Sequence, residues 1–532
     1  MTWTSTPQDD AVAEATRRPL GELDEAERYE LFDRLQARMP RAWEAVRMNH
    51  ADESVVVVPS VSLDPTLPGA GSLNQAYEER FLFLLLLLRQ PQLKMIYVTS
   101  MPISPTIVEY YLALLPGVIP SHARARLSLV SVGDSSPASL SEKLLARPRL
   151  LNRIADRIPN PERSHLVPYN TTEHERDLAI SLGIPMYGAD PRLADLGSKT
   201  GCRRLFGEVG VRYPIGTEDV HTTDDMVEAI TDMRRQRPGL TSVIVKLNEG
   251  VSGRGNAVVD LSGLPAEGPT GREQVLERVM QMQLESPRMT LDTYLGRFVA
   301  MGGIVEERIV GEEIRSPSVQ LRVTPAGAVE LLSTHDQLLG GASGQSYLGC
   351  AFPADPGYAR MISDDALAVG ERLRELGTLG RFAIDYVVVR GRDGSWASYA
   401  IELNLRKGGT THPFLTLQFL TDGRYEGDTA LFRTPDGHEK HLVATDHLES
   451  PLLRGLSTDD LFDIVARHGL HFDPSRQVGV VFHMISSLTE HGRVGLTAVG
   501  DSASDAARRH RQAERILLDE ARLAGQGRPV LS

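Results

Sequence analysis

Hydrophobic and polar positions alternate between two periods over the first third of the chain. Apolar runs typical of buried strands occur at 54–60, 94–99 and 127–132, and stretches with helical spacing lie between and before them, at 23–48, 73–89 and 107–115. Alternation of strands and helices at this length predicts βαβ units and a parallel sheet covered on both faces. We therefore predict a flexible tail at 1–22, followed by an α/β domain over 23–190.

The most apolar segment of the chain is the eight-residue run FLFLLLLL at 81–88. A helix that spans a membrane needs about 20 apolar residues. The run is therefore predicted to be part of a buried helix, and no membrane partner is expected.

The pattern changes after residue 190. Residues 191–425 mix helical spacing with several antiparallel strand pairs, which is typical of an α+β domain. Residues 426–532 predict a smaller α+β segment, with a helix at 458–467, strands at 478–486 and 493–499, and a charged terminal helix at 501–524.

Composition narrows the classes of function. The 532 residues include 57 basic and 70 acidic side chains, a formal net charge of −13, which argues against a nucleic-acid-binding protein. Two cysteines argue against a disulfide scaffold or a cysteine-rich zinc site. The first residues lack the apolar core of a signal peptide, so we expect a cytoplasmic protein.

A glycine-rich hairpin is the first candidate for chemistry. Lys246 lies in the apolar run 242–247, Gly250, Gly253 and Gly255 follow, and a second apolar run begins at 257. Such a loop can present backbone N–H groups to a polyphosphate while a lysine supplies a point charge. An ordinary mobile turn has the same pattern. The sequence at 197–200, GSKT, lacks the glycine that a P-loop has directly before its lysine.

A second hairpin is predicted over 381–406, where Asp393 and Gly394 form a two-residue turn signal. That turn would place Asp385 directly opposite Glu402, with Asn404 on the same face. Carboxylates about 5 Å apart repel each other unless a cation lies between them, and oxygen donors favour Mg²⁺. A solvated polar face with a shifted register is the alternative.

A third segment, 304–313 (IVEERIVGEE), places acids directly after a short apolar strand. Carboxylates there can accept hydrogen bonds from an adenine amino group and from ribose hydroxyls. By itself this pattern is weak evidence for a nucleotide site.

Taken in order, these segments resemble the ATP-grasp superfamily, and within it the pheganomycin-type peptide ligases and related amino-acid ligases. Residues 403–413 and 493–501 resemble segments of that narrower group. The resemblance implies an α/β and α+β multidomain protein, with a parallel-sheet pre-ATP-grasp domain at 23–190, an ATP-grasp domain at 191–425 and a small C-terminal α+β domain.

The resemblance also implies roles for individual residues. Lys199 and Lys246 would contact ATP phosphates, and Ser252, Gly253 and Gly255 would form a lid over them. Glu306 and the backbone near Ile309 would hold the adenine, and Glu313 the ribose. The implied ligands of Mg²⁺, with Mn²⁺ as an alternative ion, are Asp385, Glu402 and Asn404.

The implied reaction is ATP- and Mg²⁺-dependent ligation of a carboxylate to an amine of amino acids or peptides through an acyl phosphate, with natural-product biosynthesis as one setting. D-alanine–D-alanine ligases have an arginine two residues before the metal-binding aspartate, where this chain has Ala383. Arg322 and Arg406 are therefore the candidates for stabilising the transition state. His412 is a candidate for orienting substrate, with a structural loop histidine as the alternative. Two alternatives stay open: a carboxylase or thiol ligase, and a nucleotide-binding protein without turnover. The substrate pair, the linkage and the oligomeric state stay open as well.

Overall fold

A computed structural model describes residues 19–48, 52–62, 69–249, 255–265, 271–286, 289–340, 344 and 346–525. Most of the predicted N-terminal tail lies outside these residues, and so do the predicted lid residues Ser252 and Gly253. No helix of the described part is both long and apolar enough to cross a membrane.

The first domain is built on a parallel sheet, as the alternation of strands and helices predicts. Its strands, in the spatial order β3-β2-β1-β4, are β3 (Leu127–Ser131), β2 (Lys94–Thr99), β1 (Ser54–Val58) and β4 (Ser164–Pro168). Val55 and Val57 of β1 pack into one hydrophobic core, and Val56 and Val58 pack into another. Both faces of the sheet are therefore covered, which fits the nearly continuous apolar strands.

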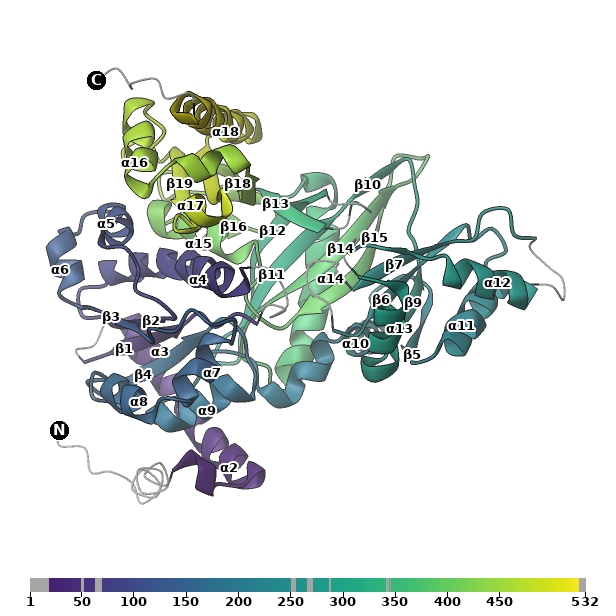
Figure 1. Cartoon of the computed structure of the whole chain (residues 1–532), viewed down its shortest axis with the longest axis horizontal. Helices are drawn as coiled ribbons and strands as arrows, with labels where there is room; N and C mark the ends of the chain where they lie inside the picture. Colours follow the sequence, from purple (N-terminus) through teal and green to yellow (C-terminus); the bar gives the residue numbers. More distant parts are fainter. Residues whose placement is uncertain are drawn as a thin grey trace.

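Helices and short 3₁₀ segments surround this sheet (Figure 1). They are η1 (Leu20–Glu22), α2 (Glu25–Gln36), α3 (Met39–Met48), α4 (Ala70–Arg80), η2 (Phe81–Arg89), α5 (Pro105–Ala113), α6 (Pro120–Arg124), α7 (Leu140–Leu145), α8 (Pro148–Ala155), η3 (Pro161–Arg163) and α9 (Glu173–Leu182). The single helix predicted over 73–89 is wrong in one respect, because α4 ends at Arg80 and the apolar run continues as a 3₁₀ helix. As predicted, that run is buried.

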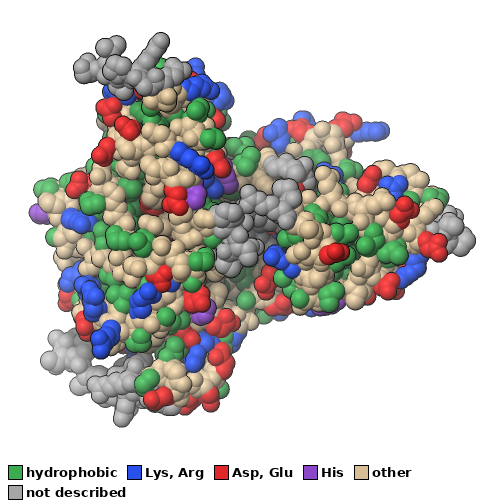
Figure 2. All heavy atoms as spheres, viewed as in Figure 1, with side chains coloured by type: hydrophobic (Ala, Val, Ile, Leu, Met, Phe, Trp, Pro, Cys, Tyr) green, Lys and Arg blue, Asp and Glu red, His purple; other side chains and the backbone are tan. Residues whose placement is uncertain are grey.

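A separate lobe, at the right of Figure 1, contains a five-stranded antiparallel sheet. Its order is β5 (Gly216–Val220), β9 (Gly303–Glu307), β6 (Ser242–Leu247), β7 (Asn256–Asp260) and β8 (Gln283–Leu284), packed with α11 (Thr223–Gln236), α12 (Gly271–Met280) and α13 (Leu291–Met301). The segments η4 (Pro191–Gly197) and α10 (Lys199–Val209) precede it. Figure 2 shows the surface hollowed between this lobe and the rest of the molecule.

A nine-stranded antiparallel sheet forms the centre of the molecule. Its strands are β10 (Glu313–Arg315), β11 (Pro317–Val323), β12 (Val329–Gly340), β13 (Ser346–Phe352), β14 (Gly380–Arg390), β15 (Trp396–Asn404), β18 (His441–Glu449), β19 (Gly479–His483) and β20 (Arg493–Gly500). Helix α14 (Pro356–Glu375) packs on one face. The described C-terminal strands thus continue the sheet of the preceding segment, and the boundary at 426 stays a prediction.

The remaining elements follow β15 in the chain. They are α15 (Thr411–Thr421), β16 (Arg424–Glu426), β17 (Leu431–Arg433), η5 (Pro451–Gly455), α16 (Thr458–Arg467), α17 (Ser487–His491) and α18 (Ala503–Gly525). The predicted helix at 458–467 is confirmed, and the charged terminal helix begins two residues later than predicted.

The hairpin of β14 and β15 corrects one prediction and confirms another. The turn is not the two-residue loop of Asp393 and Gly394, because Arg390 pairs with Trp396 and the loop runs from 391 to 395. A β-bulge in β15 then shifts the register by one residue between Asp385 and Tyr386. The observed loop shifts the pairing by one residue from the predicted register, and the bulge shifts it back by one residue. Asp385 therefore does lie opposite Glu402, as predicted.

Candidate functional site

The two carboxylates of the central hairpin lie on the sheet face turned away from α14. The side chain of Gln337 donates a hydrogen bond to Asp385 Oδ1 at 2.7 Å, and that of Asn404 donates to Asp385 Oδ2 at 3.3 Å. Burial and the neighbouring Glu402 raise the pKa of Asp385 to about 6. Two adjacent carboxylates and a side-chain amide are the hard oxygen donors that suit Mg²⁺, so the residues present fit the predicted ion.

Lys199 supplies the positive charge next to this pair. It is the first residue of α10, and its Nζ lies 2.5 Å from Glu402 Oε1. Burial acts to raise the pKa of Glu402, but Lys199 outweighs it, and the net pKa is lowered. The helix is fixed to the end of β6, because Asn248 Oδ1 accepts a hydrogen bond from the backbone N–H of Thr200 at 3.1 Å.

The second predicted lysine is held by a buried ion-pair network. Lys246 Nζ lies 2.5 Å from Glu306 Oε1, and Arg203 Nη1 lies 2.9 Å from Glu306 Oε2. All three side chains are at most 5% exposed. Sequence reasoning missed Arg203, although it lies four residues after Lys199 and therefore on the same helix face. Both carboxylate oxygens of Glu306 thus form ion pairs within the protein. The predicted contact of Glu306 with adenine stays a prediction.

The side chains along β14 that share the face of Asp385 change in character from one end to the other. Alternate residues of a strand share a face, so Arg381, Ala383, Asp385, Val387 and Val389 form one row. The row is cationic at its first residue, acidic in the middle and apolar at its last two residues. The ends of this row lie roughly 13 Å from its middle on either side.

The apolar end of the row adjoins the segment predicted to hold adenine. A cavity of about 210 Å³ is lined there by Val389 and Tyr399 of the hairpin and by Thr241, Glu307 and Ile309. This places Ile309 beside a small cavity of mixed apolar and polar lining, on the same face as Asp385.

Glu313 lies in a different position. It pairs with Arg390 in β10 and therefore shares the face of Arg390, opposite that of Asp385. Its carboxylate accepts hydrogen bonds from Arg315 at 2.8 Å and from Arg390 at 3.3 Å. This placement argues against the predicted ribose contact. Of the predicted lid residues, Gly255 is described, and its carbonyl accepts hydrogen bonds from Leu247 N and Tyr294 OH.

The two candidate arginines differ in surroundings. Arg406 is half-buried near Glu402, and its Nη1 donates a hydrogen bond to Tyr169 OH at 3.2 Å. Arg322 lies at the other end of its strand from Ser318, the residue opposite Asp385, and its Nε is 2.6 Å from Glu330 Oε2. The geometry favours Arg406, and not Arg322, as the arginine next to the carboxylate pair.

His412 belongs to a buried cluster outside the row. Its Nε2 lies 3.1 Å from His483 Nε2 and 3.3 Å from Asp446 Oδ1, and Arg80 Nη1 lies 2.5 Å from Asp446 Oδ2. These residues come from α15, β18, β19 and α4. The positive charge of Arg80 offsets the negative charge of Asp446. Because Arg80 belongs to the first domain and Asp446 to a C-terminal strand, this ion pair links the two parts of the chain. The predicted substrate contact of His412 stays untested.

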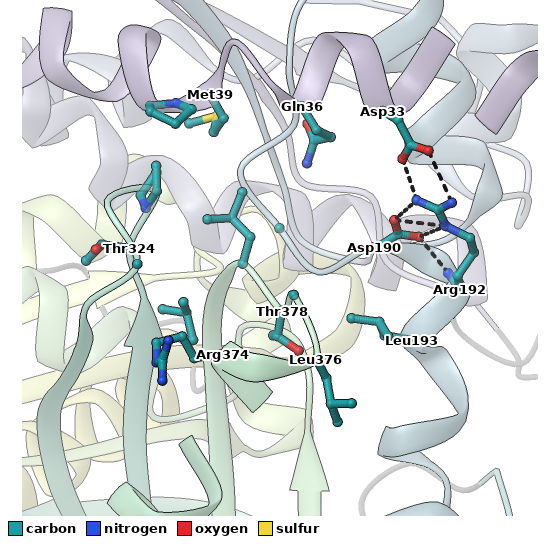
Figure 3. Close-up of a pocket in the computed structure, with 17 residues that line it drawn as sticks. Asp33, Gln36, Met39, Asp190, Arg192, Leu193, Thr324, Arg374, Leu376 and Thr378 are labelled. Carbon is teal, nitrogen blue, oxygen red and sulfur yellow. Dashed lines mark hydrogen bonds and ion pairs between the residues drawn. The ribbon is translucent and has the colours of Figure 1, made fainter. Parts of the chain in front are cut away.

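A larger cavity, of about 580 Å³, lies elsewhere (Figure 3). It is enclosed by α2 and α3, by the turn between β11 and β12 and by the segment after α14, and its lining residues include none of the predicted site residues. Arg192 closes one side of it through ion pairs with Asp33 and Asp190 (Figure 3). We assign no catalytic role to this cavity.

Comparison with known proteins agrees with this geometry. A family model described as "IQCH-like, ATP-grasp" matches residues 191–278 and 270–426, the part that contains both lysines and the carboxylate pair. Residues 191–426 of this chain therefore resemble an ATP-grasp domain. A second model, the PGM1 C-terminal domain, matches residues 460–513.

Two solved structures have the same fold at low sequence identity. An N5-carboxyaminoimidazole ribonucleotide synthetase in its ADP complex is 12% identical, with a TM-score of 0.50 over 89% of this chain and 98% of its own. The biotin carboxylase domain of 2-oxoglutarate carboxylase from Hydrogenobacter thermophilus, with MgADP and bicarbonate, is 12% identical, with a TM-score of 0.52 over 88% of this chain and 94% of its own. At such identity these structures establish the fold alone.

Two curated proteins are similar in sequence. The L-propargylglycine–L-glutamate ligase of Streptantibioticus cattleyicolor is 26% identical over 506 residues, which are 93% of this chain and 97% of that protein. IQ motif-containing protein H of Danio rerio is 24% identical over 75% of this chain, which spans only 42% of that protein. The resemblance of the ATP-grasp segment to amino-acid ligases is thereby confirmed.

Proposed function

We propose that this protein is an ATP- and Mg²⁺-dependent ligase that joins a carboxylate to an amine of amino acids or peptides, releasing ADP and phosphate. The observation that supports the proposal most directly is the row on β14, with Lys199 and Lys246 beside its acidic centre. The ligase from Streptantibioticus cattleyicolor, similar over nearly its whole length, supports an amino-acid substrate.

The residues divide the chemistry among them. Asp385, Glu402 and Asn404 would hold Mg²⁺, which supplies charge neutralisation to the triphosphate when bound. Lys199 and Lys246 add positive charge where the terminal phosphoryl group passes to the substrate carboxylate. That transfer gives an acyl phosphate and ADP.

The second half of the reaction needs an amine and a group that stabilises an oxyanion. The amine attacks the acyl carbon, the carbonyl oxygen becomes negative, and phosphate leaves as the amide forms. Arg406 is suited to stabilise that oxygen, because its guanidinium lies near Glu402 with no carboxylate bonded to it in the described structure. The Tyr169 hydroxyl keeps it oriented.

A screen of ADP release with all pairs of amino acids tests the proposal. We expect ADP and phosphate to form in equal amounts with at least one pair, and the product mass to equal the sum of both substrates minus water. ADP release that depends on bicarbonate and not on an amine would favour a carboxylase instead. MgATP binding without ADP release for any pair would favour a nucleotide-binding protein without turnover.

A further inference from the structure

The cationic end of the β14 row has no assigned role in the reaction above. Arg381 lies four residues before Asp385 on the same face, roughly 13 Å away and opposite in direction to the apolar end. If adenine occupies the apolar end and the phosphates the centre, the cationic end faces whatever lies beyond the terminal phosphate. The following inference therefore rests on the proposed function.

Two cations at this end lack a partner carboxylate among the described residues. Arg381 is half-buried. Its Nη1 is completely enclosed and donates no hydrogen bond to any described residue. Lys407 is 7% exposed, and its Nζ donates to the backbone carbonyl of Pro168 at 2.6 Å. Burial and then Arg381 lower the pKa of Lys407 to about 7. Each charge therefore lies in surroundings that oppose it.

Neutral donors around the two cations also lack partners. The Tyr187 hydroxyl and His165 Nδ1 are enclosed without an acceptor among the described residues. The group next to the Tyr187 oxygen is the guanidinium of Arg322, which can only donate, so the hydroxyl hydrogen of Tyr187 has no acceptor there. Tyr187 lies within electrostatic range of Arg381, and His165 within range of Lys407. The other nearby cation, Arg322, is already neutralised by Glu330. The positive charge and the unused donors at this end thus come from four side chains, which lie on β4, on β14 and in the segments after α9 and β15.

An anion would stabilise such a set. A buried unpaired charge costs several kcal/mol, and each enclosed donor without an acceptor adds to that cost. A carboxylate fits, because it can accept two hydrogen bonds from a guanidinium and one from a lysine. The triphosphate is a poor candidate, since Lys199 and Lys246 lie beside the centre of the row and not at this end.

We propose that Arg381 and Lys407 bind the free carboxylate of the amine substrate, an amino acid or the C-terminal residue of a peptide. The reacting carboxylate must lie at the centre of the row, next to the phosphoryl group. The carboxylate of the amine substrate does not react, so it is free to anchor that molecule from the other side. Tyr187 and His165 complete the anchor as hydrogen-bond donors.

The experiment compares each of the twenty L-amino acids with its C-terminal amide, using thermal shift titrations of the full chain with MgADP present and absent. We expect at least one amino acid to raise the melting temperature, and its amide to bind roughly 10- to 100-fold more weakly. In Arg381→Gln and Lys407→Met the amino acid and its amide should bind about equally. Arg360→Gln, an exposed arginine on α14, is the matched control and should keep the preference.

A second measurement separates this role from a structural one. Because Arg381→Gln and Lys407→Met each remove an unpaired charge, both variants should be at least as stable as the parent without ligand. Lower stability of both, an amide that binds as tightly as its acid, or no binding by any amino acid would overturn the inference. ADP release by the parent is a separate readout. Its absence would refute the proposed function, while the titrations still decide whether the carboxylate site exists.

Discussion

The buried network around Glu306 gives a prediction whose magnitude follows from its geometry. Glu306→Gln keeps the volume of the side chain but removes the charge that Lys246 and Arg203 share, at 2.5 and 2.9 Å. Arg203 keeps a second partner, Glu218, at 2.6 Å from its Nε, whereas Lys246 has no second ion pair among the described residues. Breaking a buried ion pair by removing one partner costs about 3–5 kcal/mol. We therefore expect the free energy of unfolding to fall by that amount.

Chemical denaturation with and without MgATP measures this loss. If the triphosphate contacts Lys246, its negative charge replaces that of Glu306, so MgATP should stabilise the variant more than the parent. Saturation at a hundredfold excess over the dissociation constant contributes about 2.7 kcal/mol to a protein that binds only when folded. A gain in the variant clearly above the gain in the parent identifies the Lys246 site as the place where the charge is replaced.

Glu307→Gln is the matched control, because Glu307 is the adjacent residue and is equally buried. Its partner Arg237 is half-exposed and can be hydrated when the pair is lost, so the cost should be clearly smaller. A Glu306→Gln variant as stable as the parent, or no more affected than Glu307→Gln, would refute the reasoning. Such a result would instead favour the predicted role of Glu306 in contacting adenine.

Three further predictions concern the acidic groups. Glu402→Gln should abolish ADP release while circular dichroism stays that of the parent, and normal turnover would show that the metal assignment is wrong. Asp446→Asn leaves Arg80 buried without its partner and should lower the denaturation free energy by about 3–5 kcal/mol; a loss below 1 kcal/mol would contradict the role of the cluster. Burial raises the pKa of Glu79 to about 7 from 4.5, so its ionisation destabilises the folded state increasingly as pH rises from 4.5 to 7. Glu79→Gln should therefore gain stability relative to the parent, by up to about 3 kcal/mol between pH 4.5 and 8, and an unchanged difference would refute the shift.

The local pattern of apolar and polar residues was sufficient to predict most strands and helices of the first domain. The strands at 94–99 and 127–132 were predicted within one residue, because continuous apolar runs between helical stretches have few other solutions. The helix over 73–89 failed in part. Its apolar run has no polar face to fix the period, so burial on all sides allowed a 3₁₀ helix after Arg80.

The hairpin of β14 and β15 shows what can and cannot be predicted about strand register from the type of turn. Asp393 and Gly394 correctly indicated a turn, but the loop length and the bulge in β15 are set by packing, with Tyr386 and Ala400 directed into the core below α14. The facing pair of Asp385 and Glu402 was right because two single-residue deviations cancel. A prediction from turn type alone had no means of detecting either one.

The sequence by itself determined the order of the chemical groups: two lysines, a glycine hairpin, and a strand pair with two acids. Spacing within a segment decides which side chains share a face, and that rule needs no knowledge of the fold. Only the tertiary structure decided which charges meet. Glu306 pairs with Arg203, Arg322 pairs with Glu330, Glu313 faces away from Asp385, and Arg381 and Lys407 have no carboxylate partner in the described residues. These contacts join segments distant in the chain, and their energies depend on burial and distance, which a linear pattern does not contain.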